Sequence, residues 1–114
     1  MITEHHLEQD GDRVLWRVVI DGAAALDVLT DHETLARART ALANPHRRGL
    51  VEERLGTFGP FAVTMSFSEE NQVAVAVDGP DLGTGFRGTQ AIVFYFTHEG
   101  LLAALQGKIS APAV

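Results

Sequence analysis

The chain is long enough to fold as one domain, and it has no cysteine to hold that domain together. At 114 residues it can bury roughly two-thirds of its unfolded surface, so residues 1–114 are expected to form a single domain. The lack of cysteine excludes disulfides and thiolate zinc sites, and the formal net charge of −6 argues against nucleic acid as a partner.

Membrane association is also disfavoured. No stretch approaches the roughly 18 apolar residues of a membrane-spanning helix, and the N-terminus lacks the basic and then apolar pattern of a secretion signal. These features, with the lack of cysteine, predict a cytoplasmic protein that binds no membrane.

The first third of the chain is predicted to be strands joined by tight turns. Residues 3–9 could form a first strand, with Asp10-Gly11-Asp12 as its turn. Residues 13–20 are rich in β-branched and other apolar residues and are typical of a strand. Asp21-Gly22 is a common pair in two-residue hairpin turns, so residues 23–29 are expected to return as an alanine-rich strand.

A helix is predicted over residues 31–43. Apolar residues recur at helical spacing on one face: Leu35, Ala38 and Leu42. Thr30 and Glu33 have the spacing of a capping box, in which each side chain satisfies a free backbone N–H at the helix start. Asn44-Pro45 ends the helix, because proline cannot continue the hydrogen-bond ladder.

Residues 46–59 have no single interpretation. Asn44-Pro45 could cap a second short helix that ends near Gly56, or residues 50–58 could form a strand. Gly49 weakens the helix and the charged residues at 52–54 weaken the strand. Strand or irregular structure is slightly favoured.

The most strand-like part of the chain follows. Residues 61–68 and 72–78 alternate large apolar residues with small or polar ones, which predicts one buried face for each strand. Residues 91–96 are apolar on both faces and are predicted to form an interior strand, or one covered on both sides.

The C-terminal part is expected to be helical. Thr97 can cap a helix over residues 98–106, Gly107 ends it, and residues 110–114 are expected to be a loose tail. The expected core collects the inward residues of all these elements: Trp16, Val18, Ile20, Leu35, Leu42, Phe61, Val63, Met65, Phe67, Val75, Val77, Phe94, Phe96, Leu101 and Leu105.

These elements predict an α+β fold, with an antiparallel sheet of five to six strands and two helices packed on one face. Residues 19–38 and 75–104 also echo each other. Each contains an Asp-Gly turn, a strand, a threonine and a helix that starts His-Glu. An internal duplication into two βββα halves is one interpretation, and chance is the other, because helix caps converge for physical reasons.

The glycine-rich segment Gly79–Gln90 is one candidate for ligand contact. Gly83–Gly88 matches the spacing of a dinucleotide-binding fingerprint, but a strand follows where the fingerprint needs a helix. The segment is therefore interpreted as a loop, in which Phe86 and Arg87 are large side chains that could anchor a partner.

The histidines offer two further patterns. His5 and His6 are adjacent on a predicted strand, so they should point to opposite faces and not converge on a metal. The pairs His32-Glu33 and His98-Glu99 begin the two predicted helices. A pseudo-twofold relation between the halves could bring them together as a metal or acid–base site. Neither pattern carries a known catalytic spacing, so no catalytic residue, metal or cofactor is predicted.

Acidic residues suggest a protein partner. Glu8, Asp10 and Asp12 surround one predicted turn, and Asp31 and Glu33 stand at a helix start. If these five share a surface, they would repel nucleic acid and attract a basic protein. The leading hypothesis is therefore a small non-enzymatic protein-binding module. The alternative is a small enzyme or ligand-binding protein that uses the Gly79–Gln90 loop or the two His-Glu pairs. A homodimer is left open.

The order of elements also resembles that of bacterial immunity proteins. The resemblance rests on the strands at 61–68 and 72–78, the glycine-rich loop, the strand at 91–96 and the final helix that starts after Thr97, together with the size and acidity of the chain. Immunity proteins bind and neutralise toxins, so the resemblance implies a non-enzymatic inhibitor whose partner is a toxin, such as a basic one.

Overall fold

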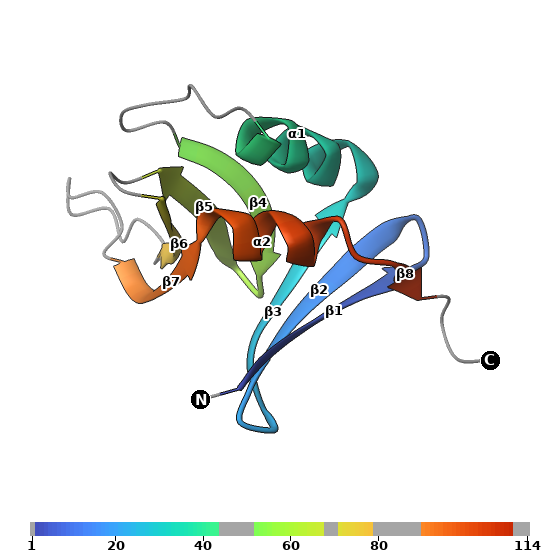
Figure 1. Cartoon of the computed structure of the whole chain (residues 1–114). Helices are drawn as coiled ribbons and strands as arrows, with labels where there is room; N and C mark the ends of the chain where they lie inside the picture. The colour runs from blue at the N-terminus through green and yellow to red at the C-terminus, as the bar shows by residue number, and fades with distance from the viewer. Residues whose placement is uncertain (1, 44–51, 68–70, 79–89, 111–114) are drawn as a thin grey trace.

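The computed structural model describes residues 2–43, 52–67, 71–78 and 90–110, which form two helices and eight strands (Figure 1). The elements in chain order are β1 (Thr3–Asp10), β2 (Arg13–Ile20), β3 (Ala23–Asp31), α1 (His32–Ala43), β4 (Glu52–Phe58), β5 (Phe61–Phe67), β6 (Gln72–Asp78), β7 (Gln90–Thr97), α2 (His98–Leu105) and β8 (Ile109–Ser110). The fold is α+β, as the sequence predicts.

All eight strands belong to one sheet, in the order β7-β6-β5-β4-β3-β2-β1-β8. Neighbours from β1 to β7 are antiparallel, and β8 runs parallel to β1, with Leu7 opposite Ile109. The prediction of five to six strands in a wholly antiparallel sheet is therefore wrong. The predicted count is too low because three strands have weak sequence patterns: β1 and β4, which the sequence indicates only weakly, are rich in charged residues, and β8 has two residues. Ser110 was expected to belong to a tail, and residues 111–114 lie outside the described residues.

Tight turns connect the first strands. Asp21 and Gly22 both have positive φ, of 52° and 82°, which is the conformation of a type I′ hairpin turn. The turn twists in the sense that the two flanking strands require, so β2 and β3 pair along their whole length. The hairpin predicted from Asp21-Gly22 is confirmed.

The two helix starts differ from each other. Thr97 caps α2 as predicted, because its hydroxyl accepts a hydrogen bond from the N–H of Gly100 at 3.0 Å. In α1 the capping side chain is Asp31, whose Oδ1 accepts from the N–H of Thr34 at 2.7 Å. The capping box of Thr30 and Glu33 is wrong. The strand continues through Asp31, opposite Arg13, so the helix starts one residue later than that box requires.

The middle of the sheet is a narrow seam between β3 and β4. The ladder between these strands contains one residue pair, Leu29 opposite Thr57. Gly56 has φ of +150°, and a Cβ built on it would lie 2.3 Å from the carbonyl oxygen of Leu29. Only glycine allows the two strands to approach this closely. The favoured strand interpretation of this region is confirmed, and a helix ending near Gly56 is wrong.

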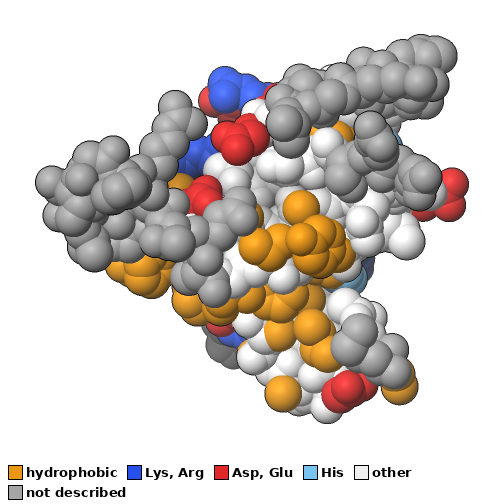
Figure 2. Space-filling model, turned by 90° about the vertical axis from the view of Figure 1, so that its left-hand side faces the viewer, with side chains coloured by type: hydrophobic (Ala, Val, Ile, Leu, Met, Phe, Trp, Pro, Cys, Tyr) orange, Lys and Arg blue, Asp and Glu red, His pale blue; other side chains and the backbone are white. Residues whose placement is uncertain are grey.

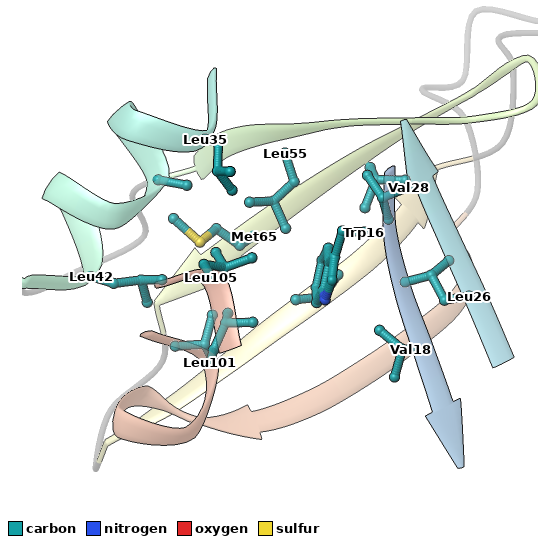
Figure 3. Close-up of a cluster of buried hydrophobic side chains, with 14 of the residues drawn as sticks. Trp16, Val18, Leu26, Val28, Leu35, Leu42, Leu55, Met65, Leu101 and Leu105 are labelled. Atoms are coloured by element: carbon teal, nitrogen blue, oxygen red, sulfur yellow. The ribbon is translucent and has the colours of Figure 1, made fainter. Parts of the chain in front are cut away.

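One core lies between the sheet and the two helices (Figure 3). Trp16 is 1% exposed and lies among side chains from both helices and from strands on both sides of the β3–β4 seam. The helices are also joined directly, since Arg39 Nε donates to the carbonyl oxygen of Leu105 at 2.6 Å. Most of the predicted core is buried as expected: Trp16, Val18, Leu35, Leu42, Val63, Met65, Phe67, Val75, Val77, Leu101 and Leu105.

Four residues of the predicted core are less buried than expected, two of them on β7 and one each on β2 and β5. Ile20, Phe61, Phe94 and Phe96 are partly buried and pack against the rim of the core. Among the described strands β7 lies at the edge of the sheet and pairs with β6 alone, and Ile92 and Tyr95 are exposed, so its prediction as an interior or doubly covered strand is wrong. A strand that is apolar on both faces can lie in the interior or at an edge, because its own sequence does not specify its neighbours.

Candidate functional site

The acidic residues singled out in the sequence converge at one end of the sheet. In the register of β1, β2 and β3, Asp10 lies opposite Arg13, and Arg13 lies opposite Asp31. Asp12 is in the turn between β1 and β2, and Glu33 is in the first turn of α1. We call the surface formed by Glu8, Asp10, Asp12, Asp31 and Glu33 the acidic end.

The acidic end faces solvent. Glu8 and Asp10 are on the face of β1 opposite the buried Leu7, and therefore on the outer face of the sheet. Asp10, Asp12, Asp31 and Glu33 are exposed, and Glu8 is partly buried. Four of the five carboxylates are therefore accessible to a partner, and the fifth, Glu8, is partly accessible.

The carboxylates of the acidic end differ in what they contact. Hydrogen bonds from the backbone and side chain of Thr34, with smaller effects of Arg13 and Arg37, lower the pKa of Asp31 below its ordinary value of 3.8. Glu33 forms an ion pair with Arg37, one helical turn along α1. No hydrogen bond or ion pair joins Asp10 or Asp12 to another described residue. Asp10 and Asp12 are therefore the carboxylates most available to a partner.

Next to the acidic end, the outer face carries an ion pair. Arg17 Nε donates to Asp27 Oδ1 at 2.8 Å, between β2 and β3. The hydrogen bond and charge of Asp27, with a smaller effect of Glu8, raise the pKa of Arg17. Arg17 is thus neutralised within the sheet and adds little positive charge to the surface beside Glu8.

The two His-Glu pairs are held apart by different neighbours. His32 Nε2 lies 2.9 Å from Gln9 Oε1, at the end of β1. His98 packs its ring against Phe67, at the end of β5, with 5.6 Å between ring centroids. Among the described residues, no group of three or more histidine, aspartate or glutamate side chains could hold a metal ion. The convergence of the pairs into one metal site is wrong.

His5 and His6 point to opposite faces, as the strand prediction requires. His6 is exposed, 3.5 Å from Glu4, whereas His5 lies inside the curve of the sheet. Trp16 Nε1 donates to His5 Nδ1 at 3.1 Å, and the two rings stack. Phe96 of β7 meets both rings, at 5.5 and 6.3 Å between centroids. This cluster links β1 and β2 to β7 across the concave side.

Burial, with a smaller contribution from His6, lowers the pKa of His5 below its ordinary value of 6.5. The hydrogen bond from Trp16 requires a lone pair on Nδ1, so the neutral ring carries its proton on Nε2. These contacts occupy His5 within the fold, and it serves as packing and orientation for Trp16.

The glycine-rich loop cannot be placed beside these surfaces. Residues 79–89, which include Phe86 and Arg87 and nearly all of the Gly79–Gln90 candidate, lie outside the described residues. The alternative hypothesis of a ligand site in this loop therefore stays a prediction.

Sequence reasoning missed the exposed side chains of β7. Ile92 and Tyr95 are 46% and 64% exposed, on opposite faces of the strand. Figure 2 views the molecule from the side on which Figure 1 draws β6 and β7, and hydrophobic side chains gather across the middle of that face. The alternation within β7 gave no signal of this exposure, because both faces of the strand are apolar.

Comparison with known protein families, with characterised proteins and with solved structures finds no match for this chain. Neither helix of the described residues is long and apolar enough to span a membrane.

Proposed function

We propose that this chain is a small, non-enzymatic, cytoplasmic protein-binding module that inhibits or regulates a basic partner protein. The bacterial immunity proteins that its element order resembles act on toxins in this way. One observation carries the proposal: the strand register gathers Asp10, Asp12 and Asp31 at one end of the sheet, with Glu8 and Glu33 beside them.

The chemistry of the acidic end favours a basic protein over a polyanion. Asp10 and Asp12 have no fixed partner among the described residues, so they can exchange water for lysine or arginine. Exposed charges of this kind contribute more to the rate of encounter than to affinity, and salt screens their effect. Apolar contacts must then supply most of the affinity.

The experiment measures association with a basic protein probe, and the first probe is the product of the neighbouring open reading frame if that frame encodes a toxin-like protein. Asp10→Lys/Asp12→Lys should slow association about tenfold or more at low ionic strength, with a smaller change in dissociation. The same double variant should protect cells less well when the toxin and this chain are expressed together.

Glu4→Lys/Glu99→Lys is the matched control. It changes the net charge by the same amount at two exposed residues outside the acidic end: Glu4 pairs with Val19 at the far end of β1, and Glu99 is in the first turn of α2. Association that is independent of salt, or that slows equally in both double variants, would contradict the proposal.

We further propose that the two βββα halves derive from an internal duplication. In each half a strand leads without a loop into a helix that begins His-Glu: β3 into α1, and β7 into α2. The described residues of 13–43 and 72–106 should then superpose along the same chain path. Unrelated paths would contradict the duplication.

A further inference from the structure

The edge of the sheet at β7 is long and uncharged. β7 pairs with β6 on one side, and no other described strand pairs with it. Its eight residues, Gln90–Thr97, include no aspartate, glutamate, lysine or arginine. Each strand edge presents a row of backbone N–H and C=O groups that need hydrogen-bond partners.

Natural edge strands are usually protected against pairing. Charged side chains, proline, bulges and short length are the common devices. The opposite edge of this sheet follows that rule, since β8 has two residues. β7 has one irregularity, between Gln90 and Ile92, but from Ile92 to Thr97 it has none of these features, and it exposes Ile92 and Tyr95 instead.

We propose that β7 pairs antiparallel with β7 of a second copy of the chain, so that one sheet continues through a twofold dimer. The inference concerns a different surface from the acidic end and does not rest on the proposed function. It assigns a second copy to the edge that the described strands leave unpaired.

The distribution of charge favours a second copy over a basic partner at this edge. Each chain has a formal net charge of −6, so two copies repel each other over most of their surfaces. They can approach where neither carries charge, and β7 is such a place. A basic partner would find no carboxylate on β7, whereas Glu8 and Asp10 lie on β1, six strands away in the sheet order.

The sequence of β7 also allows self-pairing in register. A twofold axis perpendicular to the sheet keeps each side chain on its own face, so paired residue numbers must both be even or both be odd. A centre at Phe94 pairs Ile92 with Phe96 and Val93 with Tyr95 of the other copy. Aromatic residues then lie opposite β-branched ones, a favourable cross-strand combination.

Sedimentation equilibrium across nanomolar to high micromolar concentrations tests the proposal. The unmodified chain should form dimers, and Tyr95→Lys and Ile92→Lys should each weaken dimerisation about tenfold or more, because they place charge against an apolar strand. Ile2→Lys is the matched control: it makes the same change at a residue that is 69% exposed and outside β7, and should leave dimerisation unchanged.

Two further measurements keep the test decisive. Circular dichroism and thermal unfolding show whether the lysine variants retain the fold. Amide hydrogen exchange of the unmodified chain should slow within residues 92–96 as concentration rises, with no substitution needed.

Three results would overturn the inference. The first is a chain that stays monomeric at every concentration. The second is a dimer that Ile2→Lys disrupts and Tyr95→Lys does not. The third is exchange in β7 that slows only when a different protein is added, which would assign the edge to that protein.

Discussion

The outer face of the first three strands and that of the last three long strands differ in charge. All three of the first strands carry charged side chains on this outer face: Glu4, Glu8, Asp10, Arg13, Arg17, Asp27 and Asp31. β5 and β7 contain no aspartate, glutamate, lysine or arginine, and β6 contains Asp78 at its last residue. One part of the sheet can therefore attract a charged partner at long range, and the other can bind only at contact.

The inner faces are much more alike. Val14, Trp16 and Val18 line β2 as Val73, Val75 and Val77 line β6, and all six join the same core cluster. The core requires the same apolar alternation from both parts, because both bury one face against the helices. Solvent places no such requirement on the outer faces, so their charges can differ.

The largest expected difference between the two parts of the sheet is in the stability lost when an aromatic ring is removed from each. Trp16→Ala should reduce the free energy of unfolding by about 3–5 kcal/mol, because the indole is fully buried. Phe94→Ala should cost less, about 1–2 kcal/mol, because this ring is partly buried at the edge. Urea unfolding of dilute protein measures both. Equal losses would show that β7 is covered as fully as β2.

The seam between the two parts is expected to be the next most sensitive place. Gly56→Ala should cost about 2–3 kcal/mol, because the added Cβ would meet the backbone of Leu29. Gly59→Ala is the control: Gly59 also has positive φ, but no atom lies within 4 Å of the added Cβ. Its cost should be about 1 kcal/mol, from backbone strain alone. Chemical unfolding of both variants checks the difference, and similar losses would exclude close contact at the seam.

The smallest expected difference is in the stability lost when each helix cap is removed, and this difference depends on pH. Thr97→Ala should cost about 1 kcal/mol at any pH, because the hydroxyl does not titrate in the accessible range. Asp31 has a lowered pKa in the folded state, so its stabilisation is complete above the ordinary value of 3.8 and is lost as pH falls below it. The destabilisation by Asp31→Ala should therefore shrink in acid.

Thermal unfolding from neutral to acidic pH follows both cap variants. A loss that stays constant with pH in Asp31→Ala would mean that the carboxylate does not cap α1 in its charged form.

The sequence predicts β2, β5 and β6 well, and it predicts β1, β4 and the edge position of β7 poorly. Alternation in β2, β5 and β6 reflects burial of one face, a local property that each strand's own residues record. β1 and β4 show that alternation weakly, because they each bury few large side chains: Leu7 in β1 and Leu55 in β4. Strand order is a property of pairing between distant segments, so the edge position of β7 has no local signature.

The start of α1 shows a similar limit. Thr30 and Asp31 are both good capping residues, and they are adjacent. The pairing of Arg13 with Asp31 decides between them, because it carries the strand one residue past Thr30 and leaves Asp31 next to the helix. That choice depends on the register of β2 and β3, which the local sequence does not contain.

Part of the acidic end could be predicted because a tight turn holds two of its five members together. Asp10 and Asp12 belong to the hairpin between β1 and β2, so their proximity follows from the turn. Asp31 joins them because β3 runs antiparallel beside β2 and places Asp31 opposite Arg13. The pairing of Glu33 with Arg37 follows from helical spacing, but the capping-box interpretation gave Glu33 a different role.

The contact between His5 and Trp16 makes the protein's own fluorescence informative. The chain has one tryptophan, so its emission comes from a single known place. That indole donates to the imidazole of β1 and lies 6.3 Å from the ring of Phe96 on β7. Emission wavelength and quenching respond to hydrogen bonding and to a protonated imidazole nearby. Separation of β1 from β7 during unfolding or partner binding can thus be followed optically in the unlabelled protein.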